Sequence, residues 1–241
     1  MEKLRIIFMG TPDFAVGILD TIYNNNYEIA AVVTAPDKPA GRGQKLNQSA
    51  VKIYAQEKNL KVLQPTNLKS EDFLAELAAL NANLQIVVAF RMLPKMVWQM
   101  PKLGTFNLHA SLLPDYRGAA PINWAIINGE EKTGVSTFFI DEKIDTGAII
   151  LKKETDISET ETAGELHDRL MHLGAETVVE TLKLIETNLV KTTIQPAEET
   201  KTAYKLNRDN CKIDFNKPSK DVYNLIRGLN PYPSAYTILI D

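Results

Sequence analysis

An amide and an imidazole stand two residues apart in the apolar run 105–110, as Asn107 and His109. Side chains of a β-strand alternate between its faces, so these two point the same way and their apolar neighbours point the other way. The run breaks at Pro114 and Gly118, which indicates that the strand leads into an irregular loop. Open α/β sheets bind ligands at this carboxyl edge.

A carboxylate, Asp145, begins the turn Asp-Thr-Gly after a second apolar run. An amide that donates to an oxyanion, an imidazole that moves a proton and a carboxylate that balances its charge suffice for acyl transfer. We therefore take Asn107, His109 and Asp145 as candidate catalytic residues, and expect them to converge at the carboxyl edge of one parallel sheet. Spacing alone leaves a structural alternative open, in which the three serve only a loop backbone, a hydrogen-bonded core histidine and a turn.

The segment 34–46 is long for a connection between a strand and a helix, and it combines two prolines, two glycines and three basic residues. Such loops are either functional or solvated and without a partner, and both alternatives stay open here. The Gly-Arg-Gly at 41–43 lacks the spacing of a phosphate-binding loop, and no GxGxxG follows the first strand. A dinucleotide cofactor is therefore disfavoured.

Metal chemistry is not expected, because no cluster of His, Asp and Glu has the spacing of metal ligands. The other two histidines, His167 and His172, are five residues apart in a helical pattern. They point to different faces, and we expect both at the surface.

The elements that must position the candidate residues follow from apolar periodicity. Through residue 150, apolar runs of strand length alternate with helical patterns, which predicts an α/β fold with a Rossmann-like, mostly parallel sheet and helices on both faces. Thr162 and Glu165 have the spacing of a capping box and begin a long amphipathic helix. We expect strands at 4–9, 29–34, 84–90, 104–110, 135–140 and 148–151, and a helix at 13–23.

A chain of 241 residues suffices for one full domain and part of another. The pattern loosens after Asn188. We predict a catalytic domain over 1–189, a linker over 190–206 and the beginning of a small carboxyl-terminal domain over 207–241. The last residues read as a strand with nothing to pair it, so we interpret this second domain as incomplete.

Composition indicates an ordinary globular protein, since 44% of the residues are hydrophobic and 24% are charged. The single cysteine, Cys211, excludes an intrachain disulfide framework, and the first apolar stretch is too short for a secretion signal or a membrane span. We expect a cytoplasmic monomer with no membrane partner. A net charge of −3 means that any nucleic acid must be bound by local basic patches.

Five motifs can be compared with known families: Met9-Gly-Thr-Pro-Asp-Phe-Ala15, Pro36-Asp-Lys-Pro-Ala-Gly-Arg-Gly43, Asn107-Leu-His109 with Ser111-Leu-Leu-Pro114, Tyr116-Arg-Gly-Ala-Ala-Pro121 and Asp145-Thr-Gly147. With them the chain resembles the methionyl-tRNA formyltransferases, a group within the formyltetrahydrofolate-dependent formyltransferase family, over nearly its whole length. The wider family shares the Asn, His and Ser-Leu-Leu-Pro pattern, whereas the Pro-Ala-Gly-Arg-Gly loop is specific to the tRNA enzymes. Segments 213–215 and 225–231 resemble the opening of that group's barrel-like, tRNA-binding carboxyl-terminal domain.

The resemblance implies a reaction. The free amino group of initiator methionyl-tRNA would attack the formyl carbon of the co-substrate 10-formyltetrahydrofolate, without a metal, to give formylmethionyl-tRNA for translation initiation. Asn107 and His109 would stabilise the oxyanion, and Asp145 would help to move the proton. The folate site would be lined by Ser111, Leu112, Leu113 and Pro114. The tRNA would be contacted by the basic residues of the long loop, Arg42, Lys38 and Lys45.

Three other classes of function stay open at this point. A formyltransferase acting on a nucleotide sugar or glycinamide ribonucleotide would share the three polar residues but lack the long loop. A formyltetrahydrofolate hydrolase would use water as the acceptor, and a non-enzymatic RNA-binding protein would need neither Asn107 nor Asp145. Departures from the family pattern at 90–93 and 141–144 concern the shape of the folate pocket rather than the reaction class.

Overall fold

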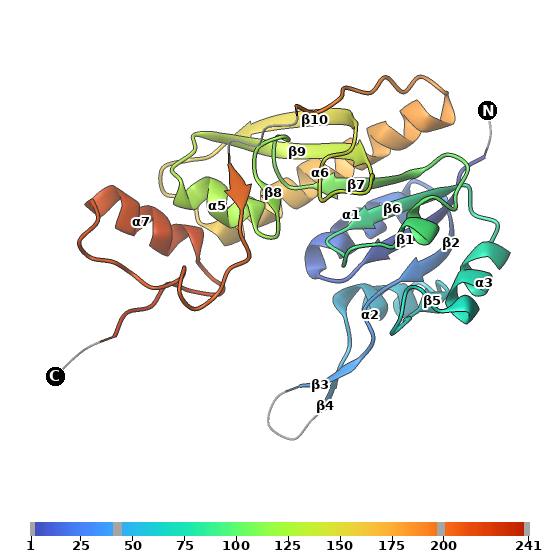
Figure 1. The fold of residues 1–241 in the computed structure, drawn as a ribbon, viewed down its shortest axis with the longest axis horizontal. Helices are drawn as coiled ribbons and strands as arrows, with labels where there is room; N and C mark the ends of the chain where they lie inside the picture. Colours follow the sequence, from blue (N-terminus) through green and yellow to red (C-terminus); the bar gives the residue numbers. More distant parts are fainter. Residues whose placement is uncertain (1–2, 41–44, 197–200, 239–241) are drawn as a thin grey trace.

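The computed structural model describes residues 3–40, 45–196 and 201–238 and is built around a seven-stranded sheet (Figure 1). The strand order is β10-β9-β7-β6-β1-β2-β5. Five strands run parallel, namely β1 (Arg5–Gly10), β2 (Glu28–Val33), β5 (Val62–Leu63), β6 (Leu84–Val88) and β7 (Thr105–His109). The last two form an antiparallel edge, β9 (Lys132–Phe139) and β10 (Ile149–Asp156). The Rossmann-like, mostly parallel sheet expected from the sequence is confirmed.

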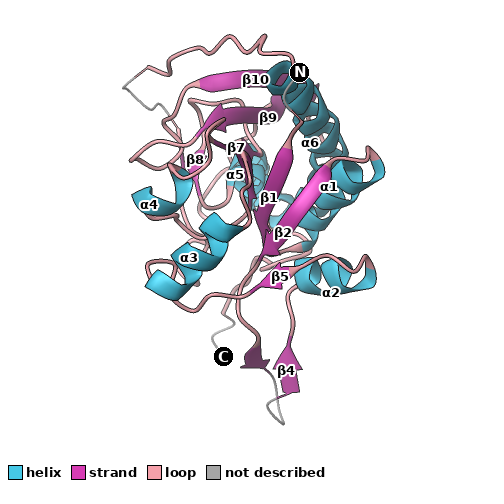
Figure 2. Cartoon of the chain, turned by 90° about the vertical axis from the view of Figure 1, so that its right-hand side faces the viewer, coloured by secondary structure: helices cyan, strands magenta, loops and turns pink. Residues whose placement is uncertain are grey.

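Helices cover both faces of this sheet (Figure 2). The first face packs against helices that share one large buried cluster, α1 (Asp13–Asn24), α2 (Ala50–Glu57), α5 (Pro121–Ile127) and α6 (Ala163–Glu186). The second face packs against two shorter helices, α3 (Glu71–Ala79) and α4 (Lys95–Trp98). The strand order reverses between β1 and β6, and open α/β sheets bind ligands at such a reversal.

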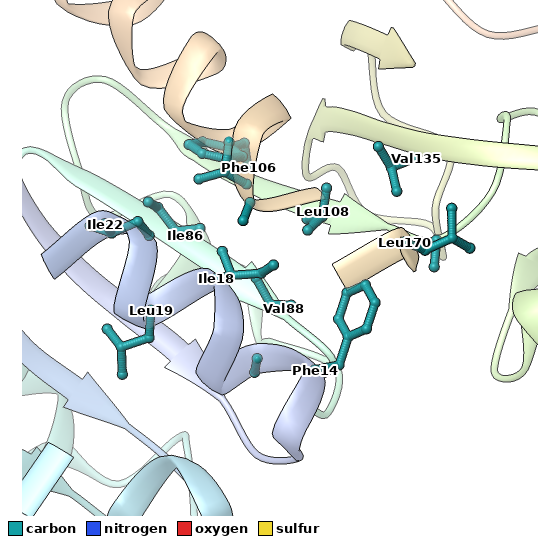
Figure 3. Close-up of a cluster of buried hydrophobic side chains, with 14 of the residues drawn as sticks. Phe14, Ile18, Leu19, Ile22, Ile86, Val88, Phe106, Leu108, Val135 and Leu170 are labelled. Atoms are coloured by element: carbon teal, nitrogen blue, oxygen red, sulfur yellow. The ribbon is translucent and has the colours of Figure 1, made fainter. Parts of the chain in front are cut away.

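The apolar side of β7 is buried in the first cluster, as the alternation in the sequence predicts. Phe106 and Leu108 lie among side chains of α1, β6 and α6 (Figure 3). The helix α6 approaches closely because it has no side chain at Gly174, where an added Cβ would lie 2.7 Å from Leu108 Cδ2. Asn107 and His109 are thereby directed to the opposite face of the strand.

The capping box of α6 is confirmed. The Thr162 hydroxyl accepts a hydrogen bond from the Glu165 N–H, and the Glu165 carboxylate accepts one from the Thr162 N–H at 2.8 Å. These bonds favour the ionised carboxylate and hold the pKa of Glu165 below its usual value.

The long loop after β2 contains a hairpin that the sequence did not predict. Strands β3 (Lys38–Ala40) and β4 (Lys45–Asn47) pair antiparallel and project from the body of the molecule (Figure 1). At its base the Asp37 carboxylate accepts hydrogen bonds from Lys52 Nζ at 2.5 Å and Gln64 Nε2 at 2.7 Å. The bond from Lys52 is the main reason why the pKa of Asp37 is lowered.

The segment predicted as a linker is attached to the body. Strand β11 (Thr202–Ala203) pairs in parallel with β8 (Arg117–Gly118), and Thr193 exchanges two main-chain hydrogen bonds of 2.8 Å with Ile149. Further along, α7 (Ser219–Gly228) packs on α5, where Asn123 Nδ2 donates to the Gly228 carbonyl at 2.7 Å. The domain boundaries and the barrel-like character of the carboxyl-terminal part stay predictions. No helix in the described ranges is long and apolar enough to span a bilayer.

Candidate active site

Two of the three candidate catalytic side chains lie on one strand at a cavity. In the sheet Asn107 is the cross-strand partner of Val87 on β6 and Phe138 on β9, so the three side chains form a row on one face. His109 follows two residues later on the same face. Asn107 and His109 both line a cavity of about 690 Å³, a volume within the usual range for small-molecule sites.

Asp145 reaches the same cavity by a route that the sequence analysis did not anticipate. We expected it at the carboxyl end of a parallel strand, but β9 runs antiparallel to β7 and ends beside the start of β7, with Phe139 opposite Phe106. The connection 140–148 therefore folds back along β7. It brings Asp145 Oδ2 to 3.8 Å from His109 Nδ1. The expected convergence is confirmed, although its reason is the folding of a connection and not strand polarity.

Hydrogen bonding fixes the protonation pattern of His109. The ring is 7% exposed, and its Nε2 lies 2.8 Å from the main-chain carbonyl oxygen of Tyr116. A carbonyl can only accept, so Nε2 carries a hydrogen and the neutral ring has its lone pair on Nδ1. Nδ1 faces Asp145 at a distance that is too long for a direct hydrogen bond. His109 can thus accept a proton at Nδ1, next to a carboxylate.

The carboxylate of Asp145 is oriented by the main chain. Its Oδ2 accepts a hydrogen bond from the Gly118 N–H at 2.9 Å, and the side chain is 15% exposed. By contrast, the Asn107 amide makes no hydrogen bond to any residue that the structure describes. A polar group at a cavity with no protein partner is available to a ligand.

The walls of the cavity come from segments on both sides of the three polar residues. One side follows β6 and includes the connection after β9, with Ala89, Phe90, Arg91, Met92, Leu93, Ile140, Asp141, Glu142, Lys143 and Ile144. The other side is formed by the starts of three helices, with Pro12, Phe14, Pro121, Ile122, Asn123 and His167. The segments 90–93 and 141–144, where the sequence departs from the family pattern, are therefore walls of the cavity.

One expected surface histidine is in fact part of this wall. His167 lies in the first turns of α6, lines the cavity and meets the Phe14 ring edge-on with ring centroids 5.2 Å apart. As helical spacing predicted, the two histidines point to different faces of α6, and His172 is exposed. The sequence could not show that the starts of α1 and α6 lie side by side.

The run Ser111 to Pro114 follows β7 but is not among the residues that line the cavity. Ser111 and Leu113 are fully buried. The Ser136 hydroxyl accepts from the Leu113 N–H at 3.1 Å and donates to the Ser111 carbonyl at 2.7 Å. This run therefore shapes the loop after β7. Folate contact by Ser111, Leu112, Leu113 and Pro114 stays a prediction.

Two of the basic residues expected to contact tRNA, Lys38 and Lys45, belong to the projecting hairpin. Lys38 is exposed on β3, and Lys45 begins β4. Arg42 falls outside the described residues, so its predicted role is not tested. In the described ranges the structure has no group of three or more His, Cys, Asp or Glu residues that could hold a metal ion.

The sequence analysis missed two buried residues next to Asp145. Arg117 and Gln195 both donate hydrogen bonds to the main-chain oxygen of Asp145, at 3.1 and 3.0 Å. Arg117 belongs to the motif Tyr-Arg-Gly, which was noticed without a role. Gln195 stands in the segment predicted as a linker and has no local signal, because its partners are distant in the sequence.

Comparison with known proteins agrees with this geometry. Residues 3–182 match the family described as formyl transferase, and residues 205–241 match the formyl transferase carboxyl-terminal domain. Methionyl-tRNA formyltransferase of Flavobacterium johnsoniae is 71% identical, over 100% of this chain and 77% of the relative. The protein of the same name from Flavobacterium psychrophilum is 69% identical, over 98% of this chain and 75% of the relative.

Among solved structures, the sugar 3N-formyl transferase WlaRD, crystallised with dTDP and 5-N-formyl-THF, is 25% identical with a TM-score of 0.69. The match covers 95% of this chain and 80% of that one. The described strands, the cavity and the sequence matches lead to one assignment. The chain belongs to the formyl transferase family and, within it, to the methionyl-tRNA formyltransferases.

Proposed function

We propose that this chain transfers the formyl group of 10-formyltetrahydrofolate to the free amino group of initiator methionyl-tRNA. The observation that carries the reaction is the convergence of Asn107, His109 and Asp145 at one cavity, with His109 Nδ1 3.8 Å from the Asp145 carboxylate. The acceptor follows from the similarity to proteins of that name at 71% and 69% identity.

The first step makes a bond between the amino nitrogen and the formyl carbon. The nitrogen lone pair attacks, the carbonyl electrons move to oxygen, and a tetrahedral oxyanion forms. The Asn107 amide, which no described residue engages, donates a hydrogen bond to this oxyanion. A donor placed where charge develops stabilises the transition state more than the substrate.

The second step moves one proton and breaks one bond. His109 accepts a proton from the attacking nitrogen at Nδ1, because Nε2 is committed to the Tyr116 carbonyl. Asp145 stabilises the resulting imidazolium across the 3.8 Å separation. The oxyanion then collapses, the bond to the folate nitrogen breaks, and that nitrogen receives the proton. No covalent enzyme intermediate is required.

The size and the lining of the cavity support this proposal. Its volume of about 690 Å³ suits a flat ring system beside the three polar groups, and so do the apolar residues among its walls, Ala89, Phe90, Met92, Leu93, Ile140 and Ile144. Phe14, Ile122 and His167 on the other side leave an apolar surface for the methionine side chain, since thioethers pack well against aromatic rings. We place the enzyme in the cytoplasm with translation, and a monomer remains our proposal.

The test is a formyl-transfer assay with three acceptors: charged initiator tRNA, free methionine and a nucleotide amino sugar. We expect transfer from 10-formyltetrahydrofolate to the charged tRNA and little to the others. A nucleotide amino sugar is the relevant competitor, because the similar structure WlaRD is a sugar formyl transferase. Faster transfer to the sugar would contradict the proposed acceptor but keep the reaction. Release of formate with no acceptor would indicate a hydrolase instead.

A further inference from the structure

The turn that contains Asp145 accepts hydrogen bonds from two buried side chains that have no role in the mechanism above. Arg117 is 5% exposed and Gln195 is 7% exposed. Gln195 Nε2 donates to the main-chain oxygen of Asp145 at 3.0 Å and to that of Gly147 at 2.8 Å. Arg117 Nε donates to the same oxygen of Asp145 at 3.1 Å. Two carbonyls of the turn are thus bound by side chains from elsewhere in the chain.

The two side chains also hold each other. Arg117 Nη2 donates to Gln195 Oε1 at 2.7 Å and to the Pro196 carbonyl at 3.2 Å. Both ends of the Gln195 amide are therefore hydrogen-bonded: its oxygen accepts from the guanidinium, and its nitrogen donates to the turn. Exchanging the two ends would place the amide nitrogen against the Arg117 donors and the amide oxygen against the two carbonyls, so only one orientation satisfies all partners.

The turn needs such support because of its backbone. Asp145 has φ of +55°, in the left-handed region that is unfavourable for a residue with a Cβ. Its carboxylate is held by the Gly118 N–H, the residue next to Arg117. The short strand β8 therefore fixes both the carbonyl and the carboxylate of Asp145, the first through a side chain and the second through the main chain.

The strand β8 is itself fastened by the segment predicted as a linker. The Lys201 carbonyl accepts from the Tyr116 N–H at 2.7 Å, and the Ala203 carbonyl accepts from the Ala119 N–H at 2.8 Å. On the other side of Gln195, Thr193 is paired with Ile149 of β10. Gln195 thus lies close to a main-chain attachment on β10, while β11 secures β8.

We propose that Arg117 and Gln195 are positioning residues that set the distance and orientation of the Asp145 carboxylate relative to His109. This rests on the proposed function, in which Asp145 stabilises the protonated imidazole. Neither residue is among those that line the cavity. We expect their substitution to lower turnover and not substrate binding, since substrate binding depends on the residues that line the cavity.

The primary variant is Gln195→Met, which keeps the length of the side chain and removes both amide atoms. We expect kcat for formyl transfer to charged tRNA to fall by about 10-fold to 100-fold, because a misplacement of about 1 Å can cost that much. The KM for 10-formyltetrahydrofolate should stay within about twofold, since the walls of the cavity are unchanged. The matched control is Ile194→Ala, because Ile194 is the adjacent residue and is 87% exposed. It should keep the kcat of the parent chain.

A second variant, Gln195→Glu, keeps the acceptor for Arg117 and loses the donor to the two carbonyls. We expect it to lower kcat as Gln195→Met does. If Gln195 only fastens the segment to Arg117, Gln195→Glu would keep full turnover, and the proposal would be wrong. This variant also carries the test if Gln195→Met does not fold.

The decisive comparison introduces Gln195→Met into an Asp145→Ala background. If Gln195 acts through Asp145, the double variant turns over no more slowly than Asp145→Ala alone. Additive losses would mean that Gln195 has only a structural role. The two proposals fail differently. Full turnover of Asp145→Ala would overturn the proposed mechanism and the positioning role with it, whereas a slow Asp145→Ala beside an unimpaired Gln195→Met would overturn only the positioning role.

Discussion

His109 depends on a main-chain atom for its chemical state. The Tyr116 carbonyl binds Nε2 and leaves the Nδ1 lone pair toward Asp145, so the base is prepared before any substrate arrives. Tyr116 has φ of +61°, and its hydroxyl hydrogen-bonds Glu130. Burial and this bond raise the pKa of Tyr116. The phenol therefore stays protonated and serves as an anchor, not as a second base.

For single residues, the alternation of polar and apolar side chains in the sequence identified two of the three polar residues of the site. Asn107 and His109 alternate with apolar residues in one strand, and that alternation fixes a shared face. The nearness of Asp145 could not be derived in the same way, because it depends on how the connection 140–148 folds back over an antiparallel strand. Gln195 carried no local signal, since its bonds reach 50 residues to Asp145 and 78 residues to Arg117.

Substitution of Asn107 by alanine should act on turnover. Loss of a single oxyanion donor costs about 100-fold to 1000-fold in rate, so kcat of Asn107→Ala should fall by that factor with little change in the KM for folate. Single-turnover kinetics with charged tRNA measure the chemical step directly. Asn24→Ala, at the far end of α1 on the surface, is the control. Normal kcat with a raised KM would contradict the assigned role.

At the scale of elements, the paired strands β9 and β10 carry Asp145 to the site, and glycine makes their close contacts possible. A Cβ at Gly147 would lie 1.6 Å from the Phe139 carbonyl oxygen, and a Cβ at Gly134 would lie 2.0 Å from that of Lys153. Both contacts are with backbone, which cannot move away without a shift of the strand. Only Gly147 is close in sequence to Asp145.

This difference gives a paired prediction. Gly147→Ala and Gly134→Ala should both lower the melting temperature, because each adds a Cβ that clashes with a main-chain oxygen of β9 or β10. Only Gly147→Ala should also lower the kcat of the folded enzyme, since it displaces the turn that carries Asp145. Thermal unfolding measures the melting temperature, and kinetics normalised to the concentration of folded enzyme measure kcat, so the two effects are separated. Equal kcat in the two variants would show that the turn tolerates the shift.

Arg42, in the long loop 34–46 of the sequence, should contact the tRNA and not the folate. Arginine binds phosphate in a bidentate manner and stacks on unpaired bases. We therefore expect Arg42→Ala to weaken transfer to charged tRNA, with a shallower dependence of binding on salt concentration. Folate binding should be nearly unchanged. Separate titrations of the two substrates measure this, and weakened folate binding with normal use of tRNA would refute the assignment.

The base of the hairpin should be sensitive to acid. The pKa of Asp37 is lowered from 3.8, chiefly by its bond to Lys52, so the charged pair stabilises the fold above the ordinary pKa and is lost as the pH falls through the lowered one. Asp37→Asn should therefore be less stable than the parent chain at neutral pH. Denaturant titrations from pH 7 to below 3.8 should show this difference shrinking, whereas a constant difference would exclude the ion pair as its cause.

At the scale of the whole molecule, one buried arginine joins the carboxyl-terminal part to the body. Arg227 is 7% exposed, and its Nη1 donates to the carbonyls of Ser158 and Glu161 at 3.0 and 2.9 Å. Both acceptors precede α6. The sequence predicted a second domain after a linker, but the extent of attachment depends on these long-range contacts, which no local pattern encodes.

Removal of this arginine should loosen the attachment of α7. Arg227→Met leaves two buried carbonyls without their donor, at a cost of about 1–3 kcal/mol in the free energy of unfolding. Denaturant titration gives that value. Amide hydrogen exchange should show faster exchange in α7 than in β6. Lys220→Met, an exposed change on the same helix, is the control and should leave both measurements unaltered. Unchanged exchange in the Arg227 variant would mean that other contacts hold α7.

The bonds from Gln195 to the turn have a consequence for the order of events during synthesis. The ribosome releases the chain from its amino end, and β6 and β7 can pair once residue 109 has emerged. Arg117, one donor to the Asp145 carbonyl, emerges before Asp145, but the second donor, Gln195, follows only after 50 more residues, and the pairing of β11 with β8 comes later still. The nascent chain thus holds an assembled sheet with an unfinished catalytic turn. By the positioning role proposed above, full turnover is expected only after residue 203 has emerged.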